Sequence, residues 1–241
     1  MMPPRTAMVL AAGLGTRMRP ITDSIPKPLV RIRGRTLLDH ALDRLEAQGV
    51  ETVVVNTHYK GEQIAAHLAA RPRPRIILSE ESELLETGGG VFKALPRLGE
   101  RFYVVNSDVF WLNGKVPALE RLARAWREDE MDALLLLQRT TTAIGYEGSG
   151  DYLLDPLGVP RRRGEREIAP FLFAGVQILH ARLFAGAASL PAKFSLLRLY
   201  DNAQEAGRLR AIVHDGEWYH IGTPAGLAMA DKRLAINRVE R

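Results

Sequence analysis

Short apolar stretches alternate with amphipathic segments through the first half of the chain. The stretches have almost no polar interruption, which is typical of strands buried on both faces of a parallel sheet. They lie at 8–12, 52–55, 75–78, 102–106 and 133–137. The segments between them repeat apolar residues at helical spacing, which predicts helices at 36–48, 61–70, 89–95 and 117–128. This alternation predicts an α/β fold with a Rossmann-like, mostly parallel sheet and helices on both faces.

The pattern changes after Gln138. Residues 145–150 are rich in glycine, and short strands are predicted at 152–154, 158–159 and 171–179. We expect these strands to extend the same sheet with mixed or antiparallel pairing and to build a lid. The rest is predicted as a helix, two short strands and a terminal helix that begins at Pro224, at 196–207, 209–213, 218–221 and 224 to about 237. No repeat or linker divides the chain, so we predict one domain over 1–241.

Composition narrows the classes of function. Hydrophobic residues make up 46% of the 241 residues, which supports a sizeable core and argues against disorder. The chain has no cysteine, so disulfides, thiol catalysis and cysteine metal sites are excluded, and a reducing cytoplasm is compatible. The N-terminal apolar run is too short for a signal peptide, and no stretch approaches the length of a membrane span. We therefore expect a cytoplasmic protein without membrane contact.

The net charge of +5 allows a nucleic-acid partner. The arginines are scattered, however, and the densest cluster is 161–163, without aromatic residues interleaved. A solvated basic surface explains this pattern better, and a site for anionic phosphates accounts for part of the excess. We therefore expect no nucleic-acid partner.

The segment 9–29 reads VLAAGLGTRMRPITDSIPKPL and carries the strongest chemical signal in the chain. After the first strand, Gly13 and Gly15 allow a loop whose backbone N–H groups converge on an anion. Arg17 and Lys27 add positive charge, and the prolines on both sides of Lys27 restrict its movement. These are the groups that a polyphosphate needs. The predicted nucleotide-binding residues of this loop are Ala11, Ala12, Gly13, Leu14, Gly15, Thr16, Arg17 and Met18.

Two other phosphate motifs do not fit this loop. A dinucleotide fingerprint requires a third glycine and a long helix after the loop, whereas Met18 and Pro20 occupy these positions. A Walker-type loop requires Gly-Lys-Ser/Thr, which is missing. A tight turn with solvated arginines remains the structural alternative for the glycines alone.

Two further clusters are candidates for the same site. Ligands bind at the carboxyl ends of parallel strands, where Asn106-Ser107-Asp108 follows the fourth strand, and a carboxylate there is a natural ligand for Mg²⁺. Considered without the neighbouring phosphate loop, Asp108 would be interpreted as a residue that caps a turn after the strand. Glu81 and the segment 85–90, LETGGG, offer backbone groups and a side chain for recognition of a base, with Thr87 and Gly88 as candidates. A flexible glycine hinge is the alternative reading.

The motifs AAGLGTRMRPIT and PKPL resemble the signature of the sugar-1-phosphate nucleotidyltransferases. ETGGGVFKAL, FAGV and WYHIGTP extend the resemblance over nearly the whole chain and bring it closest to the N-acetylmuramate 1-phosphate uridylyltransferases. The resemblance implies the nucleotide-diphospho-sugar transferase fold, with residues 1–138 binding the nucleotide and 139–241 binding the sugar phosphate. It also implies a reaction in which UTP and a sugar 1-phosphate, N-acetylmuramate 1-phosphate in peptidoglycan recycling, give a UDP-sugar and pyrophosphate.

The resemblance assigns roles to single residues. Arg17, Lys27 and Asp108 are the predicted catalytic residues, and Asp108 holds the catalytic Mg²⁺, with Mn²⁺ as the alternative ion. Lys27 is also predicted to contact the sugar phosphate, and Gly150, Asp151, Gly175 and an arginine among 161–166 are candidates for this contact by their position alone. The family commonly has Gly-Asp where this chain has Ser107-Asp108, which would leave less room near the sugar.

His220 replaces the family's second metal-binding aspartate in WYHIGTP. Imidazole suits Mn²⁺ or Zn²⁺ better than Mg²⁺, so His220 binds such a metal, binds Mg²⁺ through water, or contacts phosphate as a cation. A half-buried histidine bonded to the backbone is the structural alternative, and Asp201 and Asp215 are spare carboxylates. Two other functions stay open, namely a thymidylyl-, guanylyl- or cytidylyltransferase and a non-catalytic protein that binds nucleotide sugars. We expect a monomer or dimer.

Overall fold

The computed structural model describes residues 2–239, with side chains described through residue 235. The helices are α1 (Ile21–Ser24), α2 (Leu37–Ala47), α3 (Gly61–Ala69), α4 (Glu86–Ala94), α5 (Ala118–Ala125), α6 (Leu196–Glu205) and α7 (Pro224–Val239). The strands are β1 (Thr6–Leu10), β2 (Arg31–Ile32), β3 (Arg35–Thr36), β4 (Thr52–Thr57), β5 (Arg75–Glu80), β6 (Arg101–Asn106), β7 (Val109–Leu112), β8 (Ala133–Arg139), β9 (Ala143–Ile144), β10 (Tyr152–Leu154), β11 (Pro160–Arg162), β12 (Phe171–His180), β13 (Leu209–Val213) and β14 (Glu217–His220).

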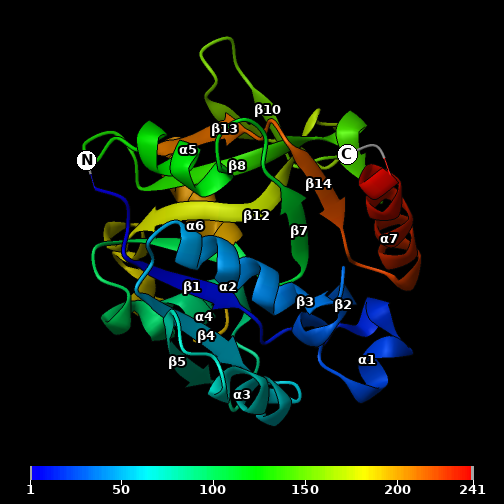
Figure 1. Cartoon of the computed structure of the whole chain (residues 1–241). Helices are drawn as coiled ribbons and strands as arrows, with labels where there is room; N and C mark the ends of the chain where they lie inside the picture. The colour runs from blue at the N-terminus through cyan, green and yellow to red at the C-terminus, as the bar shows by residue number, and fades with distance from the viewer. Residues whose placement is uncertain (1, 240–241) are drawn as a thin grey trace.

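The main sheet is mixed, as the sequence predicts (Figure 1). Its path runs β11-β10-β12-β6-β1-β4-β5, and β8 pairs with both β12 and β13. Four consecutive strands of this path run parallel to one another, namely β5, β4, β1 and β6. Their carboxyl ends therefore lie at one edge of the sheet. The long strand β12 runs antiparallel to β6 and to β8. The first half of the chain therefore supplies a parallel sheet, and the second half extends it through antiparallel pairing.

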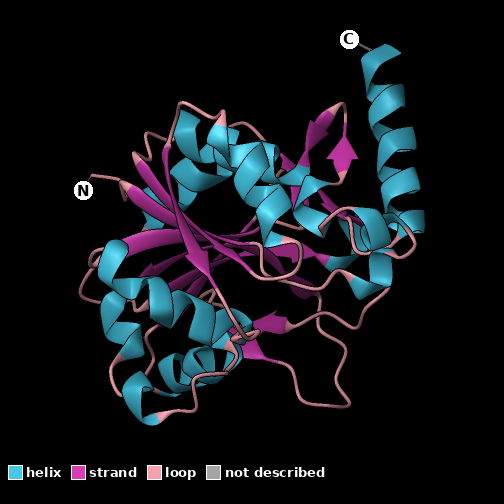
Figure 2. Ribbon diagram, turned by 90° about the horizontal axis from the view of Figure 1, so that it is seen from below, coloured by secondary structure: helices cyan, strands magenta, loops and turns pink. Residues whose placement is uncertain are grey.

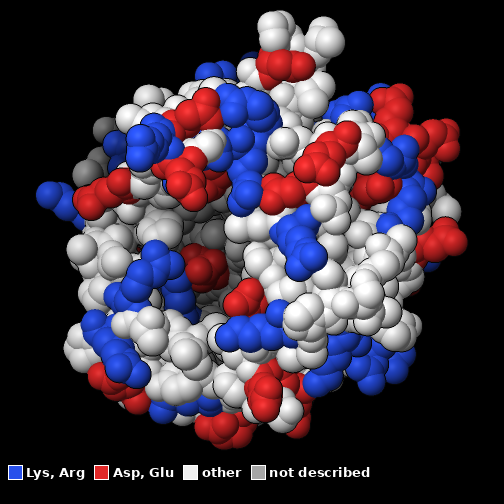
Figure 3. Space-filling model, turned by 180° about the vertical axis from the view of Figure 1, so that it is seen from behind, with Lys and Arg blue, Asp and Glu red and all other residues white. Residues whose placement is uncertain are grey.

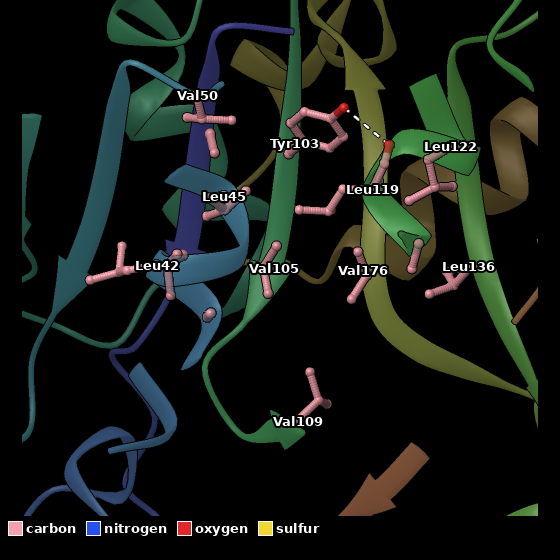
Figure 4. Packing of buried hydrophobic residues seen from close by; sticks show 14 of the residues in the cluster. Leu42, Leu45, Val50, Tyr103, Val105, Val109, Leu119, Leu122, Leu136 and Val176 are labelled. Carbon is pink, nitrogen blue, oxygen red and sulfur yellow. Dashed lines mark hydrogen bonds between the residues drawn. The ribbon is translucent and has the colours of Figure 1, made fainter. Parts of the chain in front are cut away.

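Helices cover both faces of this sheet (Figure 2). Apolar side chains of α2, α3 and α5 pack on one face, and those of α4 and α6 pack on the other. Figure 4 shows the first cluster, in which Leu42 and Leu45 of α2 lie near Val105 of β6, and the hydroxyl of Tyr103 donates to the carbonyl of Leu119. Burial of each such leucine stabilises the fold by about 1.5–3 kcal/mol. The alternation of apolar strands and amphipathic helices thus produces the layers that the pattern predicts.

A small second sheet with the order β7-β14-β9 stands beside the main one. It pairs His220 with Val109, directly after Asp108, because β14 runs antiparallel to β7. The apolar side of α7, with Ala230 and Leu234, belongs to the cluster that covers this sheet and contains Tyr219. The second sheet therefore brings the end of the chain to the carboxyl end of β6.

Most predicted elements are confirmed with small shifts at their ends. The strand predicted at 158–159 is wrong, because the Asp155 carboxylate accepts hydrogen bonds from the N–H groups of Leu157 and Val159 and holds a turn there. The strand begins instead at Pro160. Strands β2, β3, β7 and β9 were not predicted. None of the helices described in 2–239 combines the length and the apolar composition that a bilayer span requires.

Candidate active site

The loop after β1 presents a row of unpaired backbone donors. The N–H of Ala11 donates to Asn56 Oδ1 at 2.7 Å, but the N–H groups of residues 12–17 have no protein acceptor in the described part of the chain. Gly15 has φ +64°, and a Cβ there would lie 3.1 Å from side-chain atoms of Lys27 and Thr22. Four of these six residues, at 13, 14, 16 and 17, are exposed, so their N–H groups are open to solvent, and consecutive free N–H groups in such a loop are suited to an anion.

Lys27 faces this loop from the short 3₁₀ helix η2 (Lys27–Leu29). It is only 8% exposed, and its Nζ lies 2.8 Å from Asp108 Oδ2, the residue after β6 and Ser107. Burial alone would raise the pKa of Asp108, but the charge and hydrogen bond of Lys27, with the charges of His220 and Arg17, hold this pKa below its usual value. The carboxylate is therefore ionised at physiological pH.

A cavity of about 500 Å³ opens at this edge of the sheet. Both the loop and the Lys27–Asp108 pair line it. Of the predicted site residues it contains Ala11, Ala12, Gly13, Leu14, Gly15, Thr16, Arg17, Lys27, Thr87, Asn106 and Asp108. Figure 3 shows a hollow near the middle of one face of the molecule, with basic and acidic side chains around it. The cavity thus combines free amides, two cationic side chains and the carboxylates of Asp108 and Glu86.

His220 lies in the second sheet beside Gly222, which lines the first cavity, but His220 itself is in neither cavity lining. Its ring packs so closely on Gly222 that a Cβ there would lie 2.0 Å from Nε2, and the ring of Tyr146 lies edge-on with centroids 6.0 Å apart. No hydrogen bond from the imidazole to the described residues is present, so the alternative of a backbone-bonded histidine does not hold. Burial, with the charges of Lys27 and Arg17, lowers the pKa of His220, although Asp108 opposes the shift. A neutral ring is suited to metal binding or hydrogen bonding rather than to a cationic contact with phosphate.

Three predicted nucleotide-binding residues do not reach the cavity. Met18 is completely buried in the cluster around the second sheet. Glu81 is 5% exposed and accepts hydrogen bonds from Asn56 Nδ2 and the N–H of Leu85. The N–H of Gly88 donates to the carbonyl of Phe194. Glu81 therefore positions Asn56, which lines the cavity, while Met18 and Gly88 stabilise the walls.

The three glycines of α4 serve close packing rather than approach to a flat ring. A Cβ at Gly88 would lie 2.4 Å from the ring of Phe194, and one at Gly89 would lie 2.1 Å from the carbonyl oxygen of Ala192. A Cβ at Gly90 would lie 2.9 Å from Asn56 Nδ2. The first turn of α4 thus interlocks with the segment before α6, and together they form a wall of the site.

A second cavity of about 590 Å³ shares Leu10, Thr87, Asn106 and Ser195 with the first. Asp151 lines it as predicted, and its Oδ2 accepts the N–H of Phe173 at 2.8 Å. The rest of its lining comprises Tyr152, Arg162, Arg163, Gly164, Glu165, Phe173, Gln177, Leu196, Leu197 and Tyr200. The two cavities therefore adjoin each other at the ends of β1 and β6.

Two glycines predicted to contact the sugar phosphate lie outside both linings. Gly150 packs against Ala169, whose carbonyl oxygen would lie 2.1 Å from an added Cβ. Gly175 has φ +76° within the irregular part of β12, and a Cβ there would lie 2.8 Å from Val109. Both glycines shape the backbone around the site, and their contact with the sugar phosphate stays a prediction.

The structure also distinguishes among the charged candidates on the sugar side. Of the arginines in 161–166, Arg162 and Arg163 line the second cavity, whereas Arg161 pairs with exposed Glu167. Asp201 pairs with Arg162 and Asp215 pairs with Arg121, so neither replaces His220 at the metal position.

Several residues of the site were not predicted. Asn56 could have been predicted in the same way as Asn106, since both are polar residues at the end of an apolar strand. The hydroxyl of Ser107 donates to the carbonyl of Leu10 and so joins the ends of β6 and β1. Ser195 lines both cavities from a loop that no sequence pattern connects to them.

A mixed sheet covered on both faces, with free loop amides and a Lys–Asp pair at one edge, is suited to a nucleotidyltransferase. The chain belongs to this class, because residues 7–206 match the family with a MobA-like NTP transferase domain. This confirms the predicted fold and enzyme class. The sugar-phosphate nucleotidyltransferases within this class generally depend on a divalent metal ion and act on a nucleotide and a sugar phosphate.

Particular relatives lie within this family. The chain is 43% identical over 238 residues to the N-acetylmuramate alpha-1-phosphate uridylyltransferase of Caulobacter vibrioides, covering 96% of this chain and 98% of the relative. It is 32% identical to the enzyme of the same name from Neisseria meningitidis serogroup B, covering 93% and 96%. A solved UDP-glucose pyrophosphorylase complexed with UDP-glucose superposes with a TM-score of 0.79 at 16% identity, covering 98% of this chain and 100% of that one. At that identity the likeness shows the fold.

Proposed function

We propose that this chain transfers a uridylyl group from UTP to N-acetylmuramic acid 1-phosphate and releases pyrophosphate. The observation that carries the proposal is that the free amides of residues 12–17 and the Lys27–Asp108 pair line one cavity. The choice of substrates is supported by the names of the two relatives. Such a reaction would take place in the cytoplasm and return a cell-wall sugar to the nucleotide-sugar pool, as in peptidoglycan recycling.

The proposed reaction is an in-line displacement. A phosphate oxygen of the sugar 1-phosphate attacks the α-phosphorus of UTP, and the bond from that phosphorus to the bridging oxygen breaks, so that its electron pair leaves with pyrophosphate. The attacking oxygen is already ionised at neutral pH, so no protein base is needed. The loop amides and Arg17 would hold the β- and γ-phosphates, and Lys27 would neutralise charge on the attacked or the incoming phosphate. Catalysis then consists of positioning and charge stabilisation.

The donor set fits a divalent cation. Asp108 is ionised, and only one of its oxygens is bonded to Lys27. No group of three or more metal-binding side chains occurs among the described residues, so Asp108 and His220 would share the ion with substrate oxygens and water. Mg²⁺ is commonly held in this way, while an imidazole ligand favours Mn²⁺. When bound, the ion would neutralise phosphate charge between the two substrates.

A panel of triphosphates and sugar 1-phosphates, with pyrophosphate release as the readout, tests the proposal. We expect UTP with N-acetylmuramic acid 1-phosphate to give the highest kcat/KM, and a chelator to abolish turnover. Preference for another triphosphate by more than about tenfold would change the assigned base, and no release with any pair would overturn the proposal.

A further inference from the structure

Gln177 is a polar residue in an otherwise apolar strand. It lies in β12, paired in register with Val104 of β6 and Leu135 of β8, and it is 1% exposed. Both neighbours belong to the hydrophobic cluster that α4 and α6 cover. A buried polar group without a partner destabilises the fold, so each polar atom of this amide needs a hydrogen-bond partner.

Only one of the two polar atoms of the Gln177 amide has a hydrogen-bond partner in the protein. The hydroxyl of Tyr200 donates to Gln177 Oε1, whereas Nε2 has no acceptor among the described residues. If the amide were turned over, Oε1 would be the unpaired atom, so either orientation leaves one polar atom for a ligand. The hydroxyl of Tyr152 is also buried without a partner. Gln177, Tyr152 and Tyr200 all line the second cavity.

The side chains of Gln177, Tyr152 and Tyr200 are uncharged, although Asp151 and Arg162 line the same cavity. Burial raises the pKa of Tyr152 and of Tyr200, so both hydroxyls stay protonated and neutral. Phe173 packs edge-on against Tyr200 with ring centroids 6.3 Å apart, and Leu196 adds an aliphatic side chain to the same lining. Neutral hydrogen-bonding groups beside apolar ones are suited to a substituent with an amide and a methyl group.

The position of Gln177 along the sheet indicates which part of the sugar it meets. Asn106 lies where the two cavities join, because it lines both. Val104, the register partner of Gln177, lies two residues before Asn106 on the same face of β6, a separation of about 7 Å. In a 2-acetamido sugar 1-phosphate, the carbon that bears the acetamido group is bonded to the carbon that bears the phosphate. A sugar with its phosphate at the junction therefore places its acetamido group near Gln177.

We propose that Gln177, with Tyr152 and held in place by Tyr200, binds the acetamido group and selects 2-acetamido sugar 1-phosphates over sugars with a 2-hydroxyl group. Gln177 is then a specificity-determining residue and Tyr200 a positioning residue. This inference rests on the proposed function, because it assumes that the second cavity binds the sugar phosphate.

N-acetylglucosamine 1-phosphate and glucose 1-phosphate test the proposal, because they differ only at carbon 2. Gln177→Met keeps the length of the side chain and removes its hydrogen bonds. Gln138→Met is the matched control, since Gln138 is also 1% exposed, lies on neighbouring β8 and lines neither cavity. Dissociation constants from calorimetry and kcat/KM from pyrophosphate release are measured for each protein, with melting temperatures as a check on folding.

We expect the native protein to prefer the acetylated sugar. Gln177→Met should reduce this preference by about 10- to 100-fold, because the site would no longer form a hydrogen bond with the acetamido group of the sugar. Tyr200→Phe, which frees the carbonyl of Gln177, should reduce it by a smaller factor. Gln138→Met should leave the preference within about threefold of the native value.

Two results would overturn the inference, namely equal binding of the two sugar phosphates by the native protein, or an unchanged preference in Gln177→Met. Absence of pyrophosphate release with every sugar 1-phosphate would instead refute the proposed function. In that case the calorimetric preference still decides the inference about Gln177.

Discussion

Lys27→Met removes the charge of the lysine and keeps most of the length of its side chain. Lys27 is 8% exposed and its Nζ lies 2.8 Å from Asp108 Oδ2, so the ammonium group is fixed at the edge of the first cavity. Loss of a single preorganised donor to a transition-state oxygen typically costs about 10²–10³ in kcat. We expect a loss of about 10³, because Lys27 contributes a full charge in a partly enclosed cavity.

The same substitution leaves Asp108 without its ion pair. For a fully buried pair the cost would be about 3–5 kcal/mol, but the Asp108 side chain is 38% exposed, and the charge of Arg17 still acts on it. We therefore expect a loss of about 1–2 kcal/mol, which lowers the melting temperature of a domain of this size by about 2–8 °C. Adding Asp108→Asn should restore most of this stability, because no unpaired carboxylate remains.

Steady-state pyrophosphate release gives kcat, and thermal unfolding followed by circular dichroism gives the melting temperature. Lys115→Met is the control, because Lys115 is exposed and lines neither cavity, and both quantities should match those of the native protein. A Lys27→Met variant with kcat within about threefold of native would refute the role assigned to Lys27. A double variant no more stable than Lys27→Met would refute the account of the ion pair.

Other predictions concern packing, pH and metal. In Gly89→Ala the new methyl would lie 2.1 Å from the carbonyl oxygen of Ala192, so urea unfolding should show a loss of about 2 kcal/mol or more and calorimetry should show weaker binding of both substrates. A methyl at Gly13 meets no protein atom within 4 Å, so Gly13→Ala should keep native stability while KM for UTP rises. Burial lowers the pKa of the His214 imidazole. The stability that the neutral imidazole contributes is therefore complete above its ordinary pKa and is lost as the pH falls below that value. From pH 7 to 5 the free energy of unfolding should decline less in His214→Gln than in the native protein. His220→Asp should increase activity with Mg²⁺ relative to Mn²⁺, since carboxylate oxygen suits Mg²⁺ better than imidazole does.

Each of these predictions has a clear contrary result. Native stability in Gly89→Ala would contradict the close packing of α4, and unchanged kinetics in Gly13→Ala would remove this part of the loop from the nucleotide site. Parallel pH profiles of the native and His214→Gln proteins would show that His214 does not titrate with folding. An unaltered metal preference in His220→Asp would exclude His220 from the metal site.

The parallel half of the fold was predictable because its strands are buried on both faces and read as unbroken apolar runs. The strand 109–112, which follows Asp108 directly, was not predicted, and neither was its pairing with β14. That pairing fixes the position of His220 beside Asp108, although the motif around His220 already indicated the site. The sequence thus identified both residues but not the small sheet that brings them together.

Glycine and polar residues were harder to interpret. A run of three glycines is compatible with close approach of a ligand or of the chain itself, and only the three-dimensional structure shows that Phe194 fills the space beside Gly88. Glu81 was predicted to read the base, but its carboxylate is used by Asn56 and Leu85. Gln177 was overlooked because its neighbours in sequence are apolar, and its unpaired amide becomes visible only once Tyr200 is placed beside it.

A crystal structure of the protein with UTP and Mg²⁺ tests most directly whether the edge of the sheet after β1 and β6 binds the triphosphate. The account predicts phosphate oxygens within hydrogen-bond distance of the N–H groups of residues 12–17, with Arg17 and Lys27 beside them and the ion at Asp108. A nucleotide bound elsewhere, with the Lys27–Asp108 pair and the loop amides free of ligand, would contradict it.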